Sequence, residues 1–310
     1  MPLAAIVPRE LAGLRMDLAL AKLFPQYSRN RLQAWLKSGH VKVKRGASVL
    51  ELEASGQVIG GEEIALVPPP AVDVARPAAQ PMALEVAFED ASLLVINKPA
   101  GLIVHPGAGN PDRTLMNGLL AHAPQLRQVP RAGIVHRLDK DTSGLLVVAK
   151  TLSAQAQLAA QLADRSVKRT YLALVHGVPP AHGTVDAAIG RDPRSRTRMA
   201  VTTRGRPART HYKVIERFAG IARAGFALVQ CRLETGRTHQ IRVHLQHIRH
   251  PIVGDPVYQR GARAGVKFPR QALHAAALEL SHPRSGKRMD WSAPLPADMK
   301  KLLASLRHDA

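Results

Sequence analysis

The spacing of apolar residues near the start of the chain predicts two short helices followed by strands. Apolar residues recur at intervals of three and four, the spacing of one helix face, at Leu11, Leu14, Leu18 and Ala21 and again at Leu32, Trp35 and Leu36. Pro25 ends the first helix, and Ser28 is a suitable N-cap for the second, which ends at Gly39. Residues 40–44 alternate polar and apolar, and residues 62–67 form a second strand candidate. The pattern in this part of the chain therefore predicts a small α+β domain.

A proline-rich stretch follows the second strand candidate. Residues 68–81 contain five prolines and show little periodicity, which is typical of a semi-rigid linker. A chain of 310 residues is long enough for two domains. We therefore predict a first domain over residues 1–67, a linker over 68–82 and a second domain over 83–310.

The second domain is rich in strand patterns. Short apolar or alternating runs occur at 93–96, 145–149, 171–175, 211–216, 226–233 and 240–245, whereas helical spacing is found only at 115–123 and 152–162. Because helices do not alternate regularly with strands, a doubly wound parallel sheet is disfavoured. The pattern favours an α+β fold with a large mixed, mostly antiparallel sheet. Residues 191–209, with seven arginines, are predicted to form a basic loop, and residues 302–310 a frayed helix end.

Charge narrows the classes of partner. The chain carries 44 Lys and Arg residues against 23 Asp and Glu residues, a net charge of +21. Such an excess of positive charge makes the chain repel itself, and binding to a polyanion offsets this repulsion. Nucleic acid is therefore the expected partner, and an anionic membrane surface is the alternative. No segment approaches the roughly 18 to 20 apolar residues that span a bilayer, and no signal peptide is evident. A single cysteine, Cys231, allows no internal disulfide, which fits a cytoplasmic protein.

Residues 133–150, GIVHRLDKDTSGLLVVAK, combine a dense set of charges with a buried-strand pattern. The charged residues come just before the apolar run at 145–149, with turn-forming residues between them. A carboxylate, cations and a histidine at the mouth of a buried strand are costly to hold unless they pair or take part in chemistry. A charged surface loop is the alternative interpretation.

Residues 136–144, HRLDKDTSG, resemble the H-R-L-D-x-x-T-S-G motif of the RluA-type pseudouridine synthase family at every fixed position. Three further segments resemble family motifs in the same order: VINKPAGL at 95–102, KRTYLALVHG at 168–177 and LETGRTHQIRVHL at 233–245. The resemblance runs from about residue 89 to residue 291. It implies a long bent sheet with the active site across its middle, and isomerisation of uridine in RNA to pseudouridine.

The resemblance also implies roles for individual residues. Asp139 would be the catalytic carboxylate, which either attacks the sugar or removes a sugar proton. Arg242 would keep that carboxylate charged in a dry site, because a guanidinium stays protonated when buried and can bind a carboxylate through two hydrogen bonds. Tyr171 would stack on the target uracil, and Arg137 would enter the RNA when the nucleotide is flipped out. The remaining substrate-binding candidates are His136, Leu138, Thr142, His239 and Gln240.

Residues 14–67 resemble the alpha-L RNA-binding domain, a small module shared with a ribosomal small-subunit protein. The basic residues expected to contact RNA are Arg15, Arg29, Arg31, Lys37 and Lys42. An ordinary helical hairpin with a solvated basic face is the alternative. Together the two resemblances imply large-subunit ribosomal RNA, or a precursor ribosomal particle, as the partner.

The chemistry implied by the family needs no cofactor or metal, because no group is donated and nothing is oxidised. Two alternatives remain: the same reaction on transfer RNA, and a ribosome-assembly protein that binds RNA without catalysis. An intact set of Asp139, Tyr171 and Arg242 disfavours the second alternative, since a protein that only binds phosphate has no need of a carboxylate there. A monomer is the favoured oligomeric state.

Overall fold

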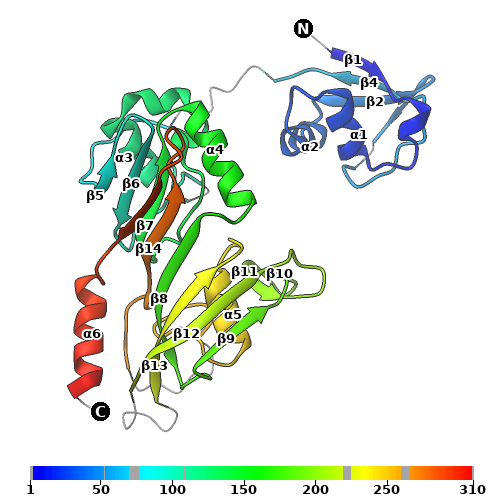
Figure 1. Cartoon of the computed structure of the whole chain (residues 1–310). Helices are drawn as coiled ribbons and strands as arrows, with labels where there is room; N and C mark the ends of the chain where they lie inside the picture. The colour runs from blue at the N-terminus through cyan, green and yellow to red at the C-terminus, as the bar shows by residue number, and fades with distance from the viewer. Residues whose placement is uncertain are drawn as a thin grey trace. The chain divides into compact units, whose positions relative to one another are not determined.

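The computed structural model describes residues 3–51, 53–69, 77–107, 109–218, 225–259 and 266–308 (Figure 1). The chain folds into two compact units, Met1–Arg76 and Pro77–Ala310. Seven residues of the predicted linker, 70–76, lie outside the described residues. Each unit has its own hydrophobic core.

The N-terminal unit is a four-stranded antiparallel sheet with two helices. Its elements are β1 (Leu3–Ile6), the 3-10 turn η1 (Arg9–Leu11), α1 (Met16–Leu23), α2 (Arg29–Lys37), β2 (Val41–Arg45), β3 (Ser48–Leu50) and β4 (Glu63–Leu66). Ser28 caps α2, because its hydroxyl accepts a hydrogen bond from the backbone N–H of Arg31 at 3.4 Å. Leu20, Leu32 and Ile64 are fully buried between the helices and the sheet. The predicted α+β arrangement is therefore confirmed.

The second unit is built on a nine-stranded sheet among the described residues, in the order β5-β6-β7-β14-β8-β13-β12-β9, with β15 also paired to β14. The strands are β5 (Val86–Glu89), β6 (Leu93–Lys98), β7 (Ser143–Ala149), β8 (Lys168–His176), β9 (His182–Asp186), β12 (Arg209–Phe218), β13 (Phe226–Leu233), β14 (Leu273–Ser281) and β15 (Arg288–Ser292). The β7–β14 pair is parallel, whereas the other pairs are antiparallel. This confirms the predicted mixed, mostly antiparallel sheet.

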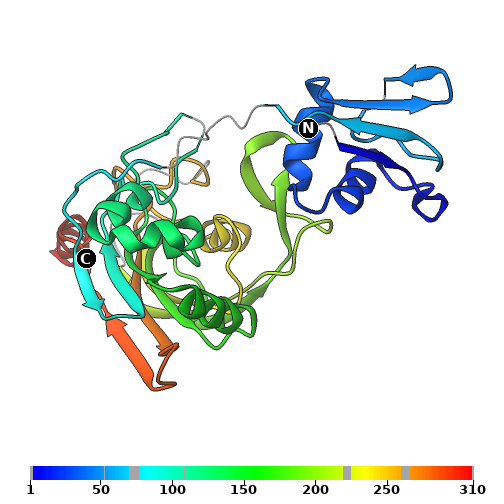
Figure 2. The same ribbon diagram turned by 90° about the horizontal axis from the view of Figure 1, so that it is seen from above.

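Helices and 3-10 turns surround this sheet, which curves around α5 when seen from above (Figure 2). They are α3 (Leu115–His122), η2 (Pro124–Gln128), η3 (Pro130–Gly133), α4 (Leu152–Ala163), α5 (Gln240–His247) and α6 (Ala297–His308). The α4 helix packs on β7, and α5 packs on β12 and on β11 (Ser195–Val201). The predicted helices at 115–123 and 152–162 are thus confirmed.

The strand predicted at 240–245 is wrong, because this segment forms α5. Its sequence alternates polar and apolar residues, yet every residue from Gln240 to Leu245 is buried. Gln240, Arg242 and His244 are accommodated inside the protein by hydrogen bonds to distant residues. Tertiary hydrogen bonds therefore override the alternation that indicated a strand.

Two further predictions are corrected. The predicted basic loop at 191–209 is largely the hairpin of β10 (Ile189–Asp192) and β11 (Ser195–Val201). Its tight turn is stabilised by the Asp192 carboxylate, which accepts a hydrogen bond from the Arg194 backbone N–H at 2.9 Å. The segment from residue 302 is not a frayed end, because α6 continues to His308 and buries Leu306 and neighbouring leucines.

Candidate active site

The loop that carries Asp139 enters β7 through a short hydrogen-bonded turn. The Thr142 backbone N–H donates to the Asp139 carbonyl at 3.1 Å, and the Leu138 side chain is buried below the loop. The Thr142 hydroxyl is also buried and accepts a hydrogen bond from Gln271 at 3.2 Å. These contacts fix the loop against the sheet and leave Asp139 facing a pocket.

His136 anchors the start of the same loop. The Val147 backbone N–H on β7 donates to its Nε2 atom at 3.1 Å. Nε2 is therefore unprotonated, and the ring proton resides on Nδ1, which is buried without a partner among the described residues. Burial lowers the pKa of His136 to about 3, and the nearby Arg169 charge acts in the same direction.

The low pKa of His136 predicts a loss of stability in acid. Its folded pKa of about 3 lies below the reference value of 6.5, so the unfolded chain binds more protons between these two values. The contribution of neutral His136 to the free energy of unfolding is complete above pH 6.5 and is lost as the pH falls towards 3. We expect the free energy of unfolding to fall less between pH 7 and pH 4.5 in His136→Gln than in the wild type. Urea denaturation at each pH measures this, and equal falls in both proteins would contradict it.

Lys98, at the end of β6, stabilises the loop that carries Asp139 through hydrogen bonds to backbone carbonyls. Its side chain is completely buried, and Nζ donates to the carbonyls of Pro99, Leu102 and Lys140 at 2.7–2.9 Å. Burial lowers the pKa of Lys98 to about 8 despite the opposing charges of Asp141 and Asp139. This lysine therefore holds the backbone of the residue after Asp139.

Asp139 is paired with Arg242 of α5, which is 103 residues away in the sequence. Arg242 Nη1 donates to Asp139 Oδ2 at 3.0 Å, while its Nε and Nη2 atoms donate to the two carboxylate oxygens of Asp255 at 2.7 and 3.0 Å. Burial alone would lower the pKa of Arg242, but the hydrogen bonds and charges of Asp255 and Asp139 outweigh it and raise that pKa. The guanidinium therefore stays charged beside Asp139.

Tyr258 and His239 complete this end of the site. The Arg242 guanidinium lies 5.1 Å from the centre of the Tyr258 ring. The Tyr258 hydroxyl accepts a hydrogen bond from the Met199 N–H and lies 2.9 Å from His239 Nδ1. His239, in a left-handed conformation before α5, places its Nε2 atom 3.9 Å from Asp139 Oδ1. Asp139 is thus bordered by two nitrogen-bearing side chains from the start of α5.

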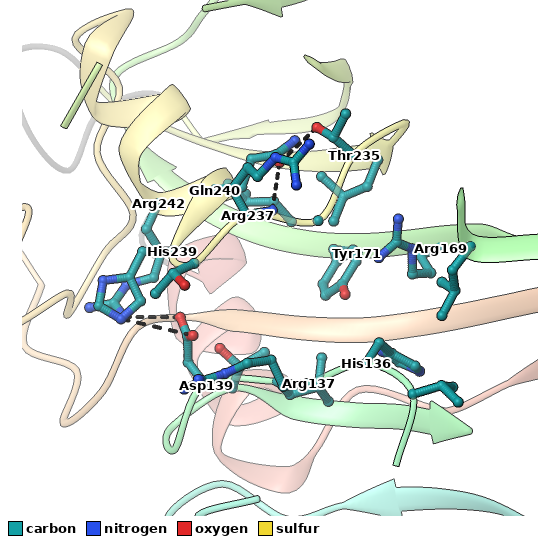
Figure 3. A pocket seen from close by; sticks show the side chains of 18 of the residues that line it. His136, Arg137, Asp139, Arg169, Tyr171, Thr235, Arg237, His239, Gln240 and Arg242 are labelled. Carbon is teal, nitrogen blue, oxygen red and sulfur yellow. Dashed lines mark hydrogen bonds and ion pairs between the residues drawn. The ribbon is translucent and has the colours of Figure 1, made fainter. Parts of the chain in front are cut away.

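Tyr171 lies on β8 in the middle of the sheet, opposite Cys231 of β13 and Ala275 of β14. The residue is only 6% exposed, and burial raises the pKa of its phenol above the usual value near 10. A raised pKa disfavours the phenolate, so the Tyr171 side chain is better suited to stacking on a base than to accepting a proton. Figure 3 shows Tyr171 between Asp139 on one side and His136 and Arg169 on the other.

One pocket of about 590 Å³ is lined by His136, Asp139, Tyr171, His239 and Arg242. Arginines from several loops and strands surround it: Arg131, Arg137, Arg165, Arg169, Arg206, Arg237 and Arg242. Burial lowers the pKa of Arg237, and the positive charges of Arg206 and Arg165 add to this effect. Such a concentration of like charge favours an anionic ligand.

The structure places the other sequence candidates as follows. Arg137 lines the pocket with an exposed side chain, as its expected entry into RNA requires. The Gln240 amide is fully used within the protein, because its oxygen accepts from Thr235 and Arg237 and its nitrogen donates to Arg209 and Thr210. Gln240 therefore shapes the loop 235–239 that borders the pocket.

Sequence reasoning missed Lys98, Asp255 and Tyr258 as parts of the site. Lys98 lies within the VINKPAGL segment at 95–102, but a buried lysine bonded to carbonyls leaves no sequence pattern. Among the described residues, no cluster of His, Cys, Asp or Glu could hold a metal ion. No described helix is long and apolar enough to cross a membrane.

The basic residues of the N-terminal unit differ in their environment. Arg15 and Arg29 bind the buried carboxylate of Asp17, which also contacts Gln33. Burial by itself would raise the pKa of Asp17, but these hydrogen bonds lower it to about 2. By contrast, the Arg31 guanidinium lies 5.6 Å from the centre of the Trp35 ring, and the Lys37 and Lys42 side chains are exposed.

Comparison with known proteins now decides the family. The profile of the RNA pseudouridylate synthase family matches residues 92–247, which include Asp139, Tyr171 and Arg242. The chain belongs to this family. Its members are isomerases, and the predicted RluA-type resemblance is confirmed.

Relatives extend the match over the whole chain. The chain is 55% identical to the ribosomal large subunit pseudouridine synthase D of Nitrosomonas europaea over 97% of its own length and 87% of the relative's. It is 48% identical to the protein of the same name from Escherichia coli, over 99% and 95% of the two chains. Among solved structures, human RNA pseudouridylate synthase domain containing 1 matches with a TM-score of 0.56 and 27% identity, covering 74% of this chain and 97% of that one.

Proposed function

We propose that this pseudouridine synthase isomerises specific uridines in large-subunit ribosomal RNA, with Asp139 as the catalytic carboxylate. The observation that carries this proposal is the pairing of Asp139 with Arg242 inside a pocket rich in arginine. The Arg242 guanidinium binds the Asp139 carboxylate where it lines the pocket, and Tyr171 offers a buried aromatic surface for the base. Arg137 would fill the space left in the RNA when the target nucleotide is flipped out.

The assignment of the substrate rests on the relatives, whose names specify the large ribosomal subunit. We infer from this that the enzyme acts in the cytoplasm, where bacterial ribosomal RNA is modified. We propose separately that it acts as a monomer. Residues 83–310 would supply catalysis and residues 1–67 an RNA-binding domain, joined by the segment 68–82. The reaction transfers the uracil within one nucleotide, so it would require no cofactor.

A substrate comparison tests this proposal. Equal amounts of large-subunit ribosomal RNA and transfer RNA, both labelled with tritium at uridine C5, are incubated with the enzyme. The proposal predicts release of tritium to water from the ribosomal RNA at least tenfold faster than from the transfer RNA. Faster release from transfer RNA would show the alternative substrate, and release from neither would contradict the proposed activity.

The N-terminal unit is proposed to bind RNA through a small basic face rather than through its net charge. Residues 1–76 contain ten Lys and Arg residues against seven Asp and Glu residues, a net charge of only +3. Arg15 and Arg29 are already paired with Asp17, which partly neutralises them. Arg31, Lys37 and Lys42 are exposed and are not paired with a carboxylate in any described contact, so they are the main candidates for phosphate contacts.

The salt dependence of RNA binding tests this face. The triple variant Arg31→Gln, Lys37→Gln, Lys42→Gln is expected to lower the slope of log Kd against log salt by about 2, since each contact to single-stranded phosphate contributes roughly 0.7. Filter binding between 50 and 300 mM salt measures the slope. A triple variant at exposed positions of the other unit, Arg288→Gln, Lys300→Gln, Lys301→Gln, is the matched control. Equal slopes for the two variants would remove this face from the RNA interface.

A further inference from the structure

Arg169 on β8 has a buried guanidinium with no hydrogen-bond or ion-pair partner among the described residues. Three arginines in the described part of the chain are less than a tenth exposed, namely Arg169, Arg242 and Arg270. Arg242 and Arg270 are each bound to carboxylates. The Arg169 side chain makes no hydrogen bond or ion pair with any described residue, and its Nε atom is completely enclosed. Because burying an unpaired charge is costly, this arrangement points to a ligand that supplies the missing negative charge.

A second unsatisfied donor lies near Arg169. The Nδ1–H group of His136 is buried without a partner among the described residues, and the ring stays neutral because burial holds its pKa low. The Arg169 charge acts on both His136 and Tyr171. Both His136 and Arg169 line the pocket, and Figure 3 places them on the side of Tyr171 that faces away from Asp139. The pocket therefore has a carboxylate at one end, an aromatic ring in the middle and two free donors at the other end.

This order matches the parts of a uridine. If the ribose lies at Asp139 and the base stacks on Tyr171, the edge of the base that carries its oxygens can lie at Arg169 and His136. We propose that Arg169, assisted by the Nδ1–H group of His136, stabilises the negative charge on the uracil as it leaves the ribose. The inference rests on the proposed function and assigns a catalytic role to a residue outside the Asp139–Arg242 pair.

The need for such a group follows from the electron balance of the reaction. If Asp139 attacks C1′, a bond forms between its oxygen and C1′, and the C1′–N1 bond breaks with its electron pair on N1. If Asp139 instead removes the C2′ proton, the C2′–H pair becomes a C1′=C2′ bond, and the same N1 departure follows. Either route leaves a uracil anion whose charge is shared by O2 and O4. The later bond from C5 to C1′ consumes this charge: on the first route the bond between Asp139 and C1′ breaks, and on the second Asp139 returns its proton to C2′. The C5 proton is then lost, and N1 takes up a proton.

A leaving base fits Arg169 better than a phosphate does. RNA phosphates are charged before, during and after the reaction, so a contact to them strengthens binding without accelerating the chemical step. Arg165 and Arg206 also line the pocket but are exposed, so they are better placed for such contacts. The uracil becomes anionic only as the glycosidic bond breaks, so a preorganised cation in the pocket selectively stabilises that step.

Gly236 provides a way to displace Arg169 without changing charge. A Cβ atom at Gly236 would lie 2.7 Å from Nη1 of Arg169. This clash involves the end of a flexible side chain, so Gly236→Ala is expected to move the guanidinium while leaving the fold intact.

The test compares two leaving groups. Single-turnover loss of the target nucleoside is measured at saturating enzyme, using large-subunit RNA with either uridine or 5-fluorouridine at the target position. Fluorine withdraws electrons and makes the departing base less basic, so its departure depends less on external stabilisation. We expect Arg169→Gln to slow the uridine substrate by about 10²-fold and the 5-fluorouridine substrate by at least tenfold less. Gly236→Ala should show the same pattern to a smaller extent, Arg169→Lys should recover part of the rate, and Arg288→Gln is the arginine control.

The proposal also predicts unchanged RNA affinity and a folded Arg169→Gln protein that is no less stable than the wild type, because an unpaired buried charge has been removed. Equal slowing of both substrates would overturn it. A reduced salt slope of binding with an unchanged single-turnover rate would show a phosphate contact instead. If the wild-type enzyme converts neither substrate, the proposed function is refuted. If the wild type and Arg169→Gln are equally active, only the proposed role of Arg169 is refuted.

Discussion

Asp139→Asn is expected to slow pseudouridine formation by about 10⁴-fold, the upper range for loss of a group that transfers a proton, while RNA affinity changes less than threefold. Asparagine keeps the size of the side chain but can neither attack the sugar nor accept its proton. Arg242 retains both of its bonds to Asp255, so the pocket should keep its shape. Single-turnover kinetics and filter binding on the same RNA separate the two effects.

Asp141 offers a matched control for this experiment. It lies in the same loop, and its side chain makes no hydrogen bond or ion pair with the described residues. Asp141→Asn removes the same charge two residues away and is expected to leave the rate within about threefold of the wild type. A comparable loss of rate in both variants, or a large loss of affinity in Asp139→Asn, would mean that the loop binds RNA instead of acting on the sugar.

Asp255→Ala is expected to cost roughly 3–5 kcal/mol of unfolding free energy, the usual penalty for breaking a buried ion pair from one side. Asp255 is only 3% exposed and accepts two hydrogen bonds from Arg242. It also accepts the backbone N–H groups of Val257 and Tyr258 at 2.9 and 3.0 Å. The substitution leaves all of these donors unpaired in a dry site. Urea denaturation of the full chain at pH 7 measures the loss.

Asp298→Ala provides the comparison for Asp255. Asp298 also accepts two hydrogen bonds from a buried arginine, Arg270, but its side chain is 40% exposed. Arg270 further donates to three backbone carbonyls. We therefore expect Asp298→Ala to cost only about 1 kcal/mol. If Asp255→Ala lowers the unfolding free energy by less than Asp298→Ala does, Arg242 does not depend on Asp255 for its position.

The general architecture is visible in the sequence because it depends on local patterns. The two short helices of the N-terminal unit follow apolar stripes and a serine cap, and β7 follows the uninterrupted apolar run at 145–149. The alternation at 240–245 misleads for a physical reason. Its polar residues face the interior, where Thr210, Asp255 and Asp139 bind them, and these partners are brought near only by the folded chain.

The candidate site was predicted only in part, because the sequence shows its motifs but not the contacts that folding creates. The motifs place Asp139, Tyr171 and Arg242 among the functional candidates, and the fold brings Asp139 and Arg242 into contact across 103 residues. The role of Lys98 could not be predicted, because its acceptors are backbone carbonyls that any residue carries. Arg169 is likewise indistinguishable from a surface arginine in the sequence, and only its burial without a partner among the described residues separates it.

The most direct test of the account is tritium release from C5-labelled large-subunit ribosomal RNA, with wild type and Asp139→Asn compared at concentrations that bind equal amounts of RNA. We expect release by the wild type, appearance of pseudouridine in digests of the same RNA, and neither signal with the variant. Release at similar rates by both proteins would contradict the assignment of Asp139, and tight binding without release by either would contradict the proposed activity on this RNA.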